Sequence, residues 1–419
     1  MAVLLLGTFD TKGGEYAYVR DLVAAAGQDV VLVDVGVMGG GTLAADVGPE
    51  AVAAAGGADL EQLRRSGDRG AALRAMADGA AAVTRDLHAR GLVSGMLALG
   101  GSGGSSVASA AMRVLPVGLP KVLVSTMAAG DVSAYVGQSD VTLMYSVVDI
   151  AGLNSISRQI LGNAAAAVAA MSAAHEQRRA AGPPSGDRPL VAATMFGVTT
   201  PAVDAARARL EELGYEVLVF HATGSGGRAM EALAAAGHFA GVLDLTTTEI
   251  ADELVGGVLT AGPDRLTAAG AAGVPQVVSL GAVDMVNFGP LDTVPERFRD
   301  RRLLVHNPTV TLMRTTPAEC AEIGRTIGTK LAAATGPVAL LVPRGGVSAV
   351  DVEGGPFHDP DADAACFEAV LSAVAGSDVQ VTEYEQDVND PRFAVAAADL
   401  LNELIQGAVA PVPTQRGSV

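Results

Sequence analysis

Strand-sized apolar runs alternate with helical segments along this chain, and this order constrains the fold more than any single motif does. In the first part of the chain the runs are Val3–Leu6, Val30–Val35, Met96–Leu99 and Val122–Ser125. A continuous apolar run indicates a strand buried on both faces, which is typical of a parallel sheet covered by helices. We therefore predict an open α/β domain here.

The same order of elements begins again near residue 190. The strands expected there are Leu190–Met195, Glu216–Phe220, Val242–Leu245, Gln276–Leu280, Leu303–Val305 and Val338–Val342. Because successive βαβ units close by right-handed crossovers, we expect two Rossmann-like domains, each an open and mostly parallel sheet flanked by helices.

The domain limits are predicted at residues 1–182 and 187–407, with a disordered tail at 408–419. The stretch His175–Pro189 is rich in Arg, Pro, Gly and Ser, which makes it the candidate linker.

Acidic residues outnumber basic ones, 46 against 28, and the formal net charge is −18. Such a surface repels nucleic acid and anionic membranes, so neither is expected as a partner. Cys320 and Cys366 belong to no metal or redox motif and suit a reducing compartment. Neither a transmembrane run nor a signal peptide is recognised, so we expect a cytoplasmic protein.

The first candidate ligand loop, Gly7–Gly13, lies between the first strand and a helix. A helix N-terminus offers free amides and partial positive charge. Thr8 and Thr11 add hydroxyls, Lys12 adds an ammonium group, and Asp10 is a candidate ligand for Mg²⁺. The spacing is not that of a P-loop. The alternative is a simple strand–helix turn with Asp10 or Thr11 as the N-cap.

The second candidate loop follows the strand Met96–Leu99 and is the sharpest local signal. It contains Gly100, Gly101, Ser102, Gly103, Gly104, Ser105 and Ser106. Glycines let the backbone approach a phosphate closely, and the serines can donate to an anion. The alternative is a tight turn that lets the helix pack on the sheet. With Ser125 and Thr126 after the next strand, this loop is predicted to bind a nucleotide.

A dinucleotide site is a further alternative, because the second loop nearly matches GxGxxG, with Ser106 in the third glycine place. Asp34 ends the second strand, where a dinucleotide-binding domain would place its ribose-binding carboxylate, and Gly36 follows in a glycine-rich loop. The loop before that strand lacks the glycine pattern, which counts against an NAD(P)-dependent oxidoreductase.

Polar residues also follow strands in the second half. Glu249, His306 and Arg344 are the candidate catalytic residues, and Gly224–Arg228 opens a helix as a candidate anion site. The structural alternatives are a carboxylate favoured by the helix dipole and a histidine without a site role. There is no GxSxG motif, so a hydrolase of that type has no support.

Seven motifs occur in order along the chain. They are GTFDTKGGEY at Gly7–Tyr16, VDVGVMG at Val33–Gly39, LGGSGGSS at Leu99–Ser106, STMAAGD at Ser125–Asp131, LDLTTTEIADELVGG at Leu243–Gly257, HNPTVTLMRTT at His306–Thr316 and PRGGVSAVD at Pro343–Asp351. With them the chain resembles, to about Gly407, an uncharacterised bacterial and fungal family. That family is homologous to the ATP-binding N-terminal region of the tomato mosaic virus resistance protein (the Tm-one-like ATP-binding domain family).

The resemblance implies two Rossmann-like domains, ATP bound to the first, and a homodimer. Where the family usually has Gly-Thr after its glycine loop, this chain has Gly104-Ser105, which keeps a hydroxyl group. The plant homologue also carries a C-terminal barrel domain, so a separately encoded barrel protein is an expected partner.

The predicted function is therefore ATP binding, with Mg²⁺ as a candidate cofactor. One hypothesis is an ATP-dependent enzyme that acts on a small metabolite in the cleft between the domains. The alternative is a non-catalytic nucleotide-binding module that regulates or scaffolds the barrel protein.

Overall fold

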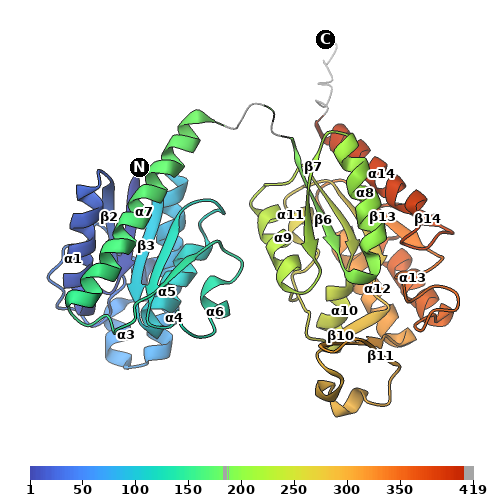
Figure 1. Ribbon diagram of the computed structural model, residues 1–419, viewed down its shortest axis with the longest axis horizontal. Coiled ribbons are helices and arrows are strands. Elements are labelled where there is room, and N and C mark those ends of the chain that lie inside the picture. Colours follow the sequence, from blue (N-terminus) through green and yellow to red (C-terminus); the bar gives the residue numbers. More distant parts are fainter. Residues whose placement is uncertain (183–185, 187, 410–419) are drawn as a thin grey trace, which may run out of the picture. The chain divides into compact units, whose positions relative to one another are not determined.

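The computed structural model describes residues 1–182, 186 and 188–409, so most of the tail predicted at 408–419 lies outside the described residues. The chain divides into two compact units, 1–186 and 187–419. In Figure 1 each unit has a largely parallel sheet flanked by helices, which confirms the predicted fold class.

The N-terminal unit contains a five-stranded parallel sheet in the order β2-β1-β3-β4-β5. Its elements are β1 (Ala2–Gly7), α1 (Phe9–Ala25), β2 (Asp29–Asp34), α2 (Pro49–Ala55), α3 (Leu60–Ser66), α4 (Arg69–Ala89), β3 (Val93–Gly100), α5 (Ser102–Arg113), β4 (Lys121–Ser125), α6 (Ser133–Val136), β5 (Thr142–Tyr145) and α7 (Ser155–Ala181). The strand order reverses direction between β1 and β3. Their carboxyl ends are therefore the topological switch point, where open α/β sheets bind ligands.

Strand β1 is buried at every residue because its alternate side chains enter two separate cores. Leu4 and Leu6 pack into the core that contains Met76 of α4. Val3 and Leu5 pack on the other face, with Val19 of α1 among their neighbours. Helices on both faces thus explain why the strand sequence is apolar throughout.

The predicted linker is partly wrong, because helix α7 continues to Ala181 and includes residues 175–181. This segment, HEQRRAA, contains alanine, glutamate, glutamine and arginine, which all favour helices.

The main sheet of the C-terminal unit is parallel, in the order β14-β13-β9-β8-β6-β7. Its first elements are β6 (Leu190–Met195), η1 (Gly197–Thr199), α8 (Thr200–Glu212), β7 (Glu216–His221), α9 (Ser225–Ala235), β8 (Gly241–Thr246), α10 (Thr248–Val255), α11 (Ala268–Ala271) and β9 (Gln276–Gly281). The later ones are β10 (Met285–Phe288), η2 (Leu291–Thr293), η3 (Glu296–Phe298), β11 (Leu303–Asn307), β12 (Val310–Arg314), α12 (Pro317–Ala332), β13 (Val338–Pro343), α13 (Pro360–Val374), β14 (Gln380–Tyr384) and α14 (Pro391–Val409).

The strand predicted at Leu303–Val305 exists, but it does not join the parallel sheet. It forms part of β11 in a separate antiparallel sheet, ordered β10-β12-β11. The turn between β11 and β12 is too short for a parallel crossover, so the two strands must run antiparallel. Asn307 stabilises this turn by accepting a hydrogen bond from the amide of Thr309 at 2.9 Å.

Across the described part of the chain, no helix combines the length and apolar character needed to cross a bilayer.

Candidate functional site

A cavity of about 590 Å³ opens at the carboxyl ends of β1 and β3 in the N-terminal unit. Its volume is that of a typical small-molecule site. It is lined by Thr8, Asp10, Thr11, Lys12, Val35, Val37, Met38, Leu63, Arg64, Gly67, Asp68, Arg69, Ala72, Leu73, Met76, Gly101, Ser102, Gly103, Gly104 and Val107. The two predicted loops, about ninety residues apart in the sequence, therefore contribute to one wall.

The start of helix α5 faces this cavity. Gly101 is the N-cap residue and makes no side-chain cap, and the amide of Ser105 bonds the carbonyl of Gly101 at 2.8 Å. The amides that precede Ser105 in the helix have no intrahelical carbonyl to bond. They carry the positive end of the helix dipole, so the cavity wall favours an anionic group.

Three glycines at this helix start are not required by the packing of the protein itself. An added Cβ at Gly101, Gly103 or Gly104 would have its nearest neighbour at 3.7, 3.4 and 3.7 Å, which is ordinary van der Waals contact. Alanine would also suit a helix better than glycine. All three glycines line the cavity, so this part of its wall is backbone without side chains.

Other glycines of the predicted site have a packing role instead. A Cβ at Gly7 would collide with the hydroxyl of Tyr16, and one at Gly100 would lie 2.8 Å from the amide of Ser105. The buried Tyr16 hydroxyl donates to the carbonyl of Leu6 at 2.6 Å and accepts from the amide of Leu99 at 2.7 Å. It thus joins β1 and β3 where they separate, and burial raises its pKa.

Lys12 lies on the cavity wall and donates a hydrogen bond to the carbonyl of Ile150. Its backbone is not helical, with φ −131° and ψ 23°, so α1 is kinked at this residue. Nearby, the amide of Gly152 donates to Glu15 at 2.6 Å. These two bonds tie the β5–α7 loop to the start of α1.

The two predicted aspartates differ in their surroundings. Asp10 lines the cavity and accepts from the amide of Met38 at 2.8 Å through Oδ2, while its buried Oδ1 has no partner among the described residues. Asp34 Oδ1 accepts from the amides of Phe9 at 3.0 Å and Gly36 at 2.8 Å. Burial raises the pKa of Asp34 in spite of these bonds. Asp34 therefore holds two loops together and is not part of the cavity wall, and neither is Gly36.

The remaining predicted residues also lie outside this cavity. Ser105 and Ser125 are buried and share a hydrogen bond of 2.7 Å between their hydroxyls, which links α5 to the end of β4. Thr126 lines a neighbouring cavity of about 260 Å³ at the ends of β4 and β5.

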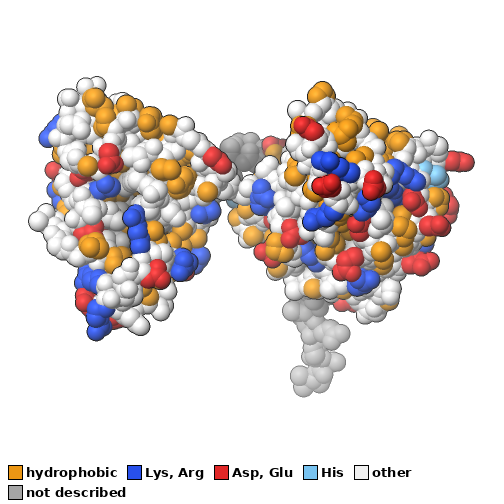
Figure 2. Space-filling model, turned by 90° about the horizontal axis from the view of Figure 1, so that it is seen from below, with side chains coloured by type: hydrophobic (Ala, Val, Ile, Leu, Met, Phe, Trp, Pro, Cys, Tyr) orange, Lys and Arg blue, Asp and Glu red, His pale blue; other side chains and the backbone are white. Residues whose placement is uncertain are grey.

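Sequence reasoning missed the opposite wall, which comes from α3, α4 and the turn between them. Arg64 donates to the carbonyl of Val37 at 2.5 Å. Arg69 lies with one guanidinium nitrogen 3.6 Å from the Cβ position of Gly103, and no described residue accepts a hydrogen bond from it. On the face shown in Figure 2, basic side chains are interspersed with acidic and apolar ones.

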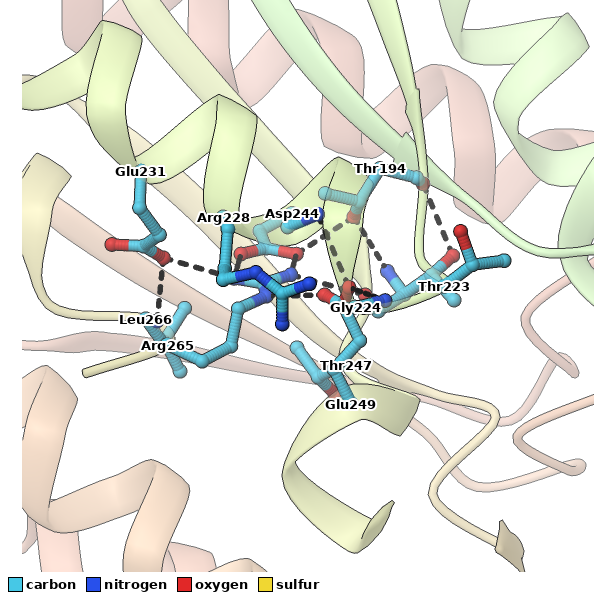
Figure 3. A network of polar contacts seen from close by, with 12 residues as sticks. Thr194, Thr223, Gly224, Arg228, Glu231, Asp244, Thr247, Glu249, Arg265 and Leu266 are labelled. Atoms are coloured by element: carbon cyan, nitrogen blue, oxygen red, sulfur yellow. Dashed lines mark hydrogen bonds and ion pairs between the residues drawn. The ribbon is translucent and has the colours of Figure 1, made fainter. Parts of the chain in front are cut away.

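In the C-terminal unit, the glycine-rich helix start is filled by the protein's own carboxylate (Figure 3). Glu249 is buried, and its Oε1 accepts from the amides of Gly224 at 2.6 Å and Gly227 at 3.1 Å. Its Oε2 accepts from Arg265 Nε at 2.6 Å. This corrects two predictions: the segment Gly224–Arg228 is not an open anion site, and Glu249 is an internal counter-ion without access to solvent.

Arg265 is the centre of this network (Figure 3). Its fully buried guanidinium also forms two bonds to Asp244, at 2.5 and 2.7 Å, and contacts Glu231 at 3.2 Å. Asp244 in turn accepts from the hydroxyl of Thr194 at 2.7 Å. A buried guanidinium is costly unless it is paired. Arg265 finds its partners on β8 and α9, and Asp244 extends the network to β6, so the network connects these three elements.

The predicted catalytic residues do not form one constellation. His306 is exposed at the end of β11, whereas Arg344 follows β13 and bonds Glu383 at 2.6 Å. Within the described ranges, no hydrogen bond or ion pair joins any two of Glu249, His306 and Arg344. That each of these three residues lies at or after the end of a strand does not determine whether their side chains meet.

Two family models match almost the entire chain. The model of the uncharacterised protein family UPF0261 N-terminal domain matches residues 1–177, and that of its C-terminal domain matches residues 188–405. The chain belongs to the UPF0261 family.

Its relatives agree with this assignment. A UPF0261 protein of Clostridium tetani is 50% identical over 404 residues, which cover 96% of this chain and 99% of that protein. The ToMV resistance protein Tm-1(GCR237) of Solanum lycopersicum is 45% identical over 314 residues, 74% of this chain and 42% of that protein. The resemblance inferred from the motifs is thus confirmed, and the cavity lies within the UPF0261 N-terminal domain.

Proposed function

We propose that the N-terminal unit binds ATP together with Mg²⁺ in the cavity at the ends of β1 and β3. The observation that carries this proposal is the start of α5, where Gly101, Gly103 and Gly104 leave room that the protein does not use. Backbone amides at a glycine-rich helix start are a common means of binding phosphate. The site lies at the switch point of the sheet, where such ligands bind.

The cations on the cavity wall suit the charge of a triphosphate. Arg69 has no acceptor among the described residues and points its guanidinium toward the glycine loop. Lys12 could exchange the Ile150 carbonyl for a phosphate oxygen, because an ionic hydrogen bond is stronger than one to a neutral carbonyl.

The buried, unpartnered Oδ1 of Asp10 fits a magnesium ligand. Magnesium prefers carboxylate oxygens and is usually bound jointly by one or two carboxylates and the phosphates of a substrate. When bound, the ion would neutralise charge on the phosphates. Asp10 would hold it at the start of α1, two residues before Lys12.

The rest of the cavity suits a flat and mostly apolar base. Leu63, Leu73, Met76 and Val107 line the wall formed by α3, α4 and α5. A dinucleotide is less suited, because Asp34 is engaged with two backbone amides outside the cavity.

A thermal-shift panel of the full chain with ATP, ADP, NAD and NADP, each with Mg²⁺, tests the proposal. A ligand that binds only the folded state raises the unfolding temperature. We expect the largest rise with ATP and a smaller one in Arg69→Gln. A rise with NAD alone, or none with any nucleotide, contradicts the proposal.

A binding role without turnover is the second candidate function, and the separation of Glu249, His306 and Arg344 favours it. Phosphate release from ATP, measured with and without small carboxylates, separates the two functions. ATP that binds but is never cleaved supports a regulatory or scaffolding module, whereas metabolite-dependent release supports an enzyme.

A further inference from the structure

A group of metal-ligating side chains lies in the C-terminal unit, beside helix α13. Asp351, His358 and Asp363 each offer one ligand atom, and these atoms lie within 4.8 Å of one another. Asp351 is buried in the segment after β13, His358 belongs to the loop before α13, and Asp363 lies in the first turn of that helix. Three separate segments thus bring an imidazole and two carboxylates together.

The spacing is close to that of a metal site. Ligand atoms bonded at about 2.0–2.2 Å to one ion can be no more than about 4.4 Å apart. Three ligand atoms around one ion lie closer together than this limit, so each atom would need to move inward by up to about 0.7 Å. His358 is in a loop, so it can make this movement without displacing a strand or helix.

One guanidinium lies beside this group, in contact with two of its carboxyls. Arg314 contacts Asp363 at 2.6 Å and Asp351 at 3.3 Å. The fully buried Asp284 interacts electrostatically with Arg314 and Asp363, and its Oδ2 accepts from the hydroxyl of Ser348 at 2.9 Å. One guanidinium thus lies among three acidic side chains, and a divalent cation would add positive charge to this group. Buried carboxylates are costly unless such compensation is present.

The neighbouring groups give a second, independent indication of a ligand. Asp284 Oδ1 is buried and has no hydrogen-bond partner in the described part of the chain. A cavity of about 160 Å³, lined by Arg344, His358 and Asp363 among others, leads to the group from outside. Arg344, which also lines this cavity, is paired with Glu383.

We propose that Asp351, His358 and Asp363 bind a divalent transition-metal ion, with Asp284 as a further carboxylate behind them. An imidazole combined with carboxylates suits Zn²⁺ or Mn²⁺ better than Mg²⁺ or Ca²⁺, which prefer oxygen ligands alone. Arg314 contacts both carboxylates through their Oδ1 atoms and would hold their orientation. This site is in the C-terminal unit and does not depend on the proposed ATP site.

The full chain, stripped of metal with a chelator, is titrated with Zn²⁺ and separately with Mn²⁺ by calorimetry. The test variant is His358→Ala, and the matched control is His238→Ala, which removes an exposed histidine from the same unit. We expect one ion per chain in the wild type and the control, and at least tenfold weaker binding in His358→Ala. Asp363→Asn should also weaken binding.

Thermal unfolding of each variant without metal shows whether it is folded. If Asp363→Asn fails this check, the comparison of His358→Ala with His238→Ala decides alone, because His358 lies in a loop. The proposal is overturned if the wild type binds neither ion. It is also overturned if His358→Ala binds as tightly as the wild type, or if both histidine variants lose affinity equally.

Discussion

Glu249 accepts a hydrogen bond from the amide of Gly224 at 2.6 Å, at the start of helix α9. Together with the bond from Gly227, this contact fills the place where a bound anion would lie. In the N-terminal unit, no described side chain caps the start of α5. Two domains of the same fold class therefore use a glycine-rich helix start differently: one closes it internally and the other leaves it open to a cavity.

Replacing Glu249 should destabilise the protein strongly. Glu249→Ala removes one partner of Arg265 and leaves the buried amides of Gly224 and Gly227 without an acceptor. We therefore expect the free energy of unfolding to fall by about 3–5 kcal/mol. Glu249→Gln should cost less, since it keeps one acceptor oxygen. Urea unfolding of the full chain measures both.

The control for this prediction is Glu368→Ala, which removes an exposed glutamate from helix α13. Its effect should stay within about 0.5 kcal/mol. Equal stability of Glu249→Ala and the control would show that the network around Arg265 does not depend on this carboxylate.

Asp252 should make the stability depend on pH. Burial raises the pKa of its carboxyl to about 7, although it accepts from the side chain of Asn287 at 2.6 Å. Between pH 4 and 7 the folded protein keeps a proton that the unfolded chain has lost. This contribution to stability is therefore complete at low pH and is lost as pH rises through 7.

In Asp252→Asn this titration is absent, so the free energy of unfolding should fall less between pH 5 and 7.5 than in the wild type. Asn287 has an unpartnered Oδ1 that can accept from the new amide group after its side chain turns. Asp264→Asn, at an exposed position in the same unit, is the control. A pH profile of Asp252→Asn parallel to that of the wild type would contradict the prediction.

Gly103→Ala should weaken ATP binding without lowering the free energy of unfolding. The added methyl group fits the protein and favours the helix, so the unfolding free energy should stay the same or rise by up to about 1 kcal/mol. It would also enter the space assigned to the phosphates, so ATP binding should weaken. Denaturant unfolding and calorimetric titration measure the two effects.

The comparison variant is Gly100→Ala, whose Cβ would lie 2.8 Å from the backbone of Ser105. That variant should lose stability. If Gly103→Ala binds ATP as the wild type does, the open space at the start of α5 has no role in binding.

Through Lys12, ATP binding should change the hydrogen exchange of the β5–α7 loop. Lys12→Gln removes the charge that would bind a phosphate, and a charged hydrogen bond contributes about 1.5–3 kcal/mol, so ATP affinity should fall about 10- to 100-fold. In the wild type, ATP should draw Lys12 from the carbonyl of Ile150 and increase hydrogen exchange in residues 146–152. Titration and exchange measured by mass spectrometry test the two parts.

The control is Arg85→Gln, which removes one exposed positive charge from helix α4 of the same unit. It should leave both the affinity and the exchange pattern unchanged. An equal loss of affinity in the two variants would mean that only net charge matters.

The central strands could be predicted from sequence because both of their faces are buried. The apolar runs Val3–Leu6 and Met96–Leu99 predict β1 and the central part of β3. β5 and β14 lie at sheet edges, and neither is predicted from the sequence. The apolar run in β5 is only three residues long, and β14 is mostly exposed and has no apolar run.

The sequence predicts only those parts of the site whose residues are neighbours in the chain. The glycine loop of α5 follows its strand directly, so the sequence shows both together. The pairing of Glu249 with Gly224 joins residues 25 positions apart, and the approach of Arg69 to Gly103 depends on how α4 packs on α5. Such contacts depend on tertiary packing, which no local pattern encodes.

Photolabelling of the full chain with 8-azido-ATP and Mg²⁺, followed by peptide mapping, tests the central claim most directly. The account predicts that label is attached to the wall formed by α3, α4 and α5, near Leu63, Leu73 or Met76, and that excess ATP prevents it. Label confined to the C-terminal unit, or label that ATP does not displace, would contradict the account.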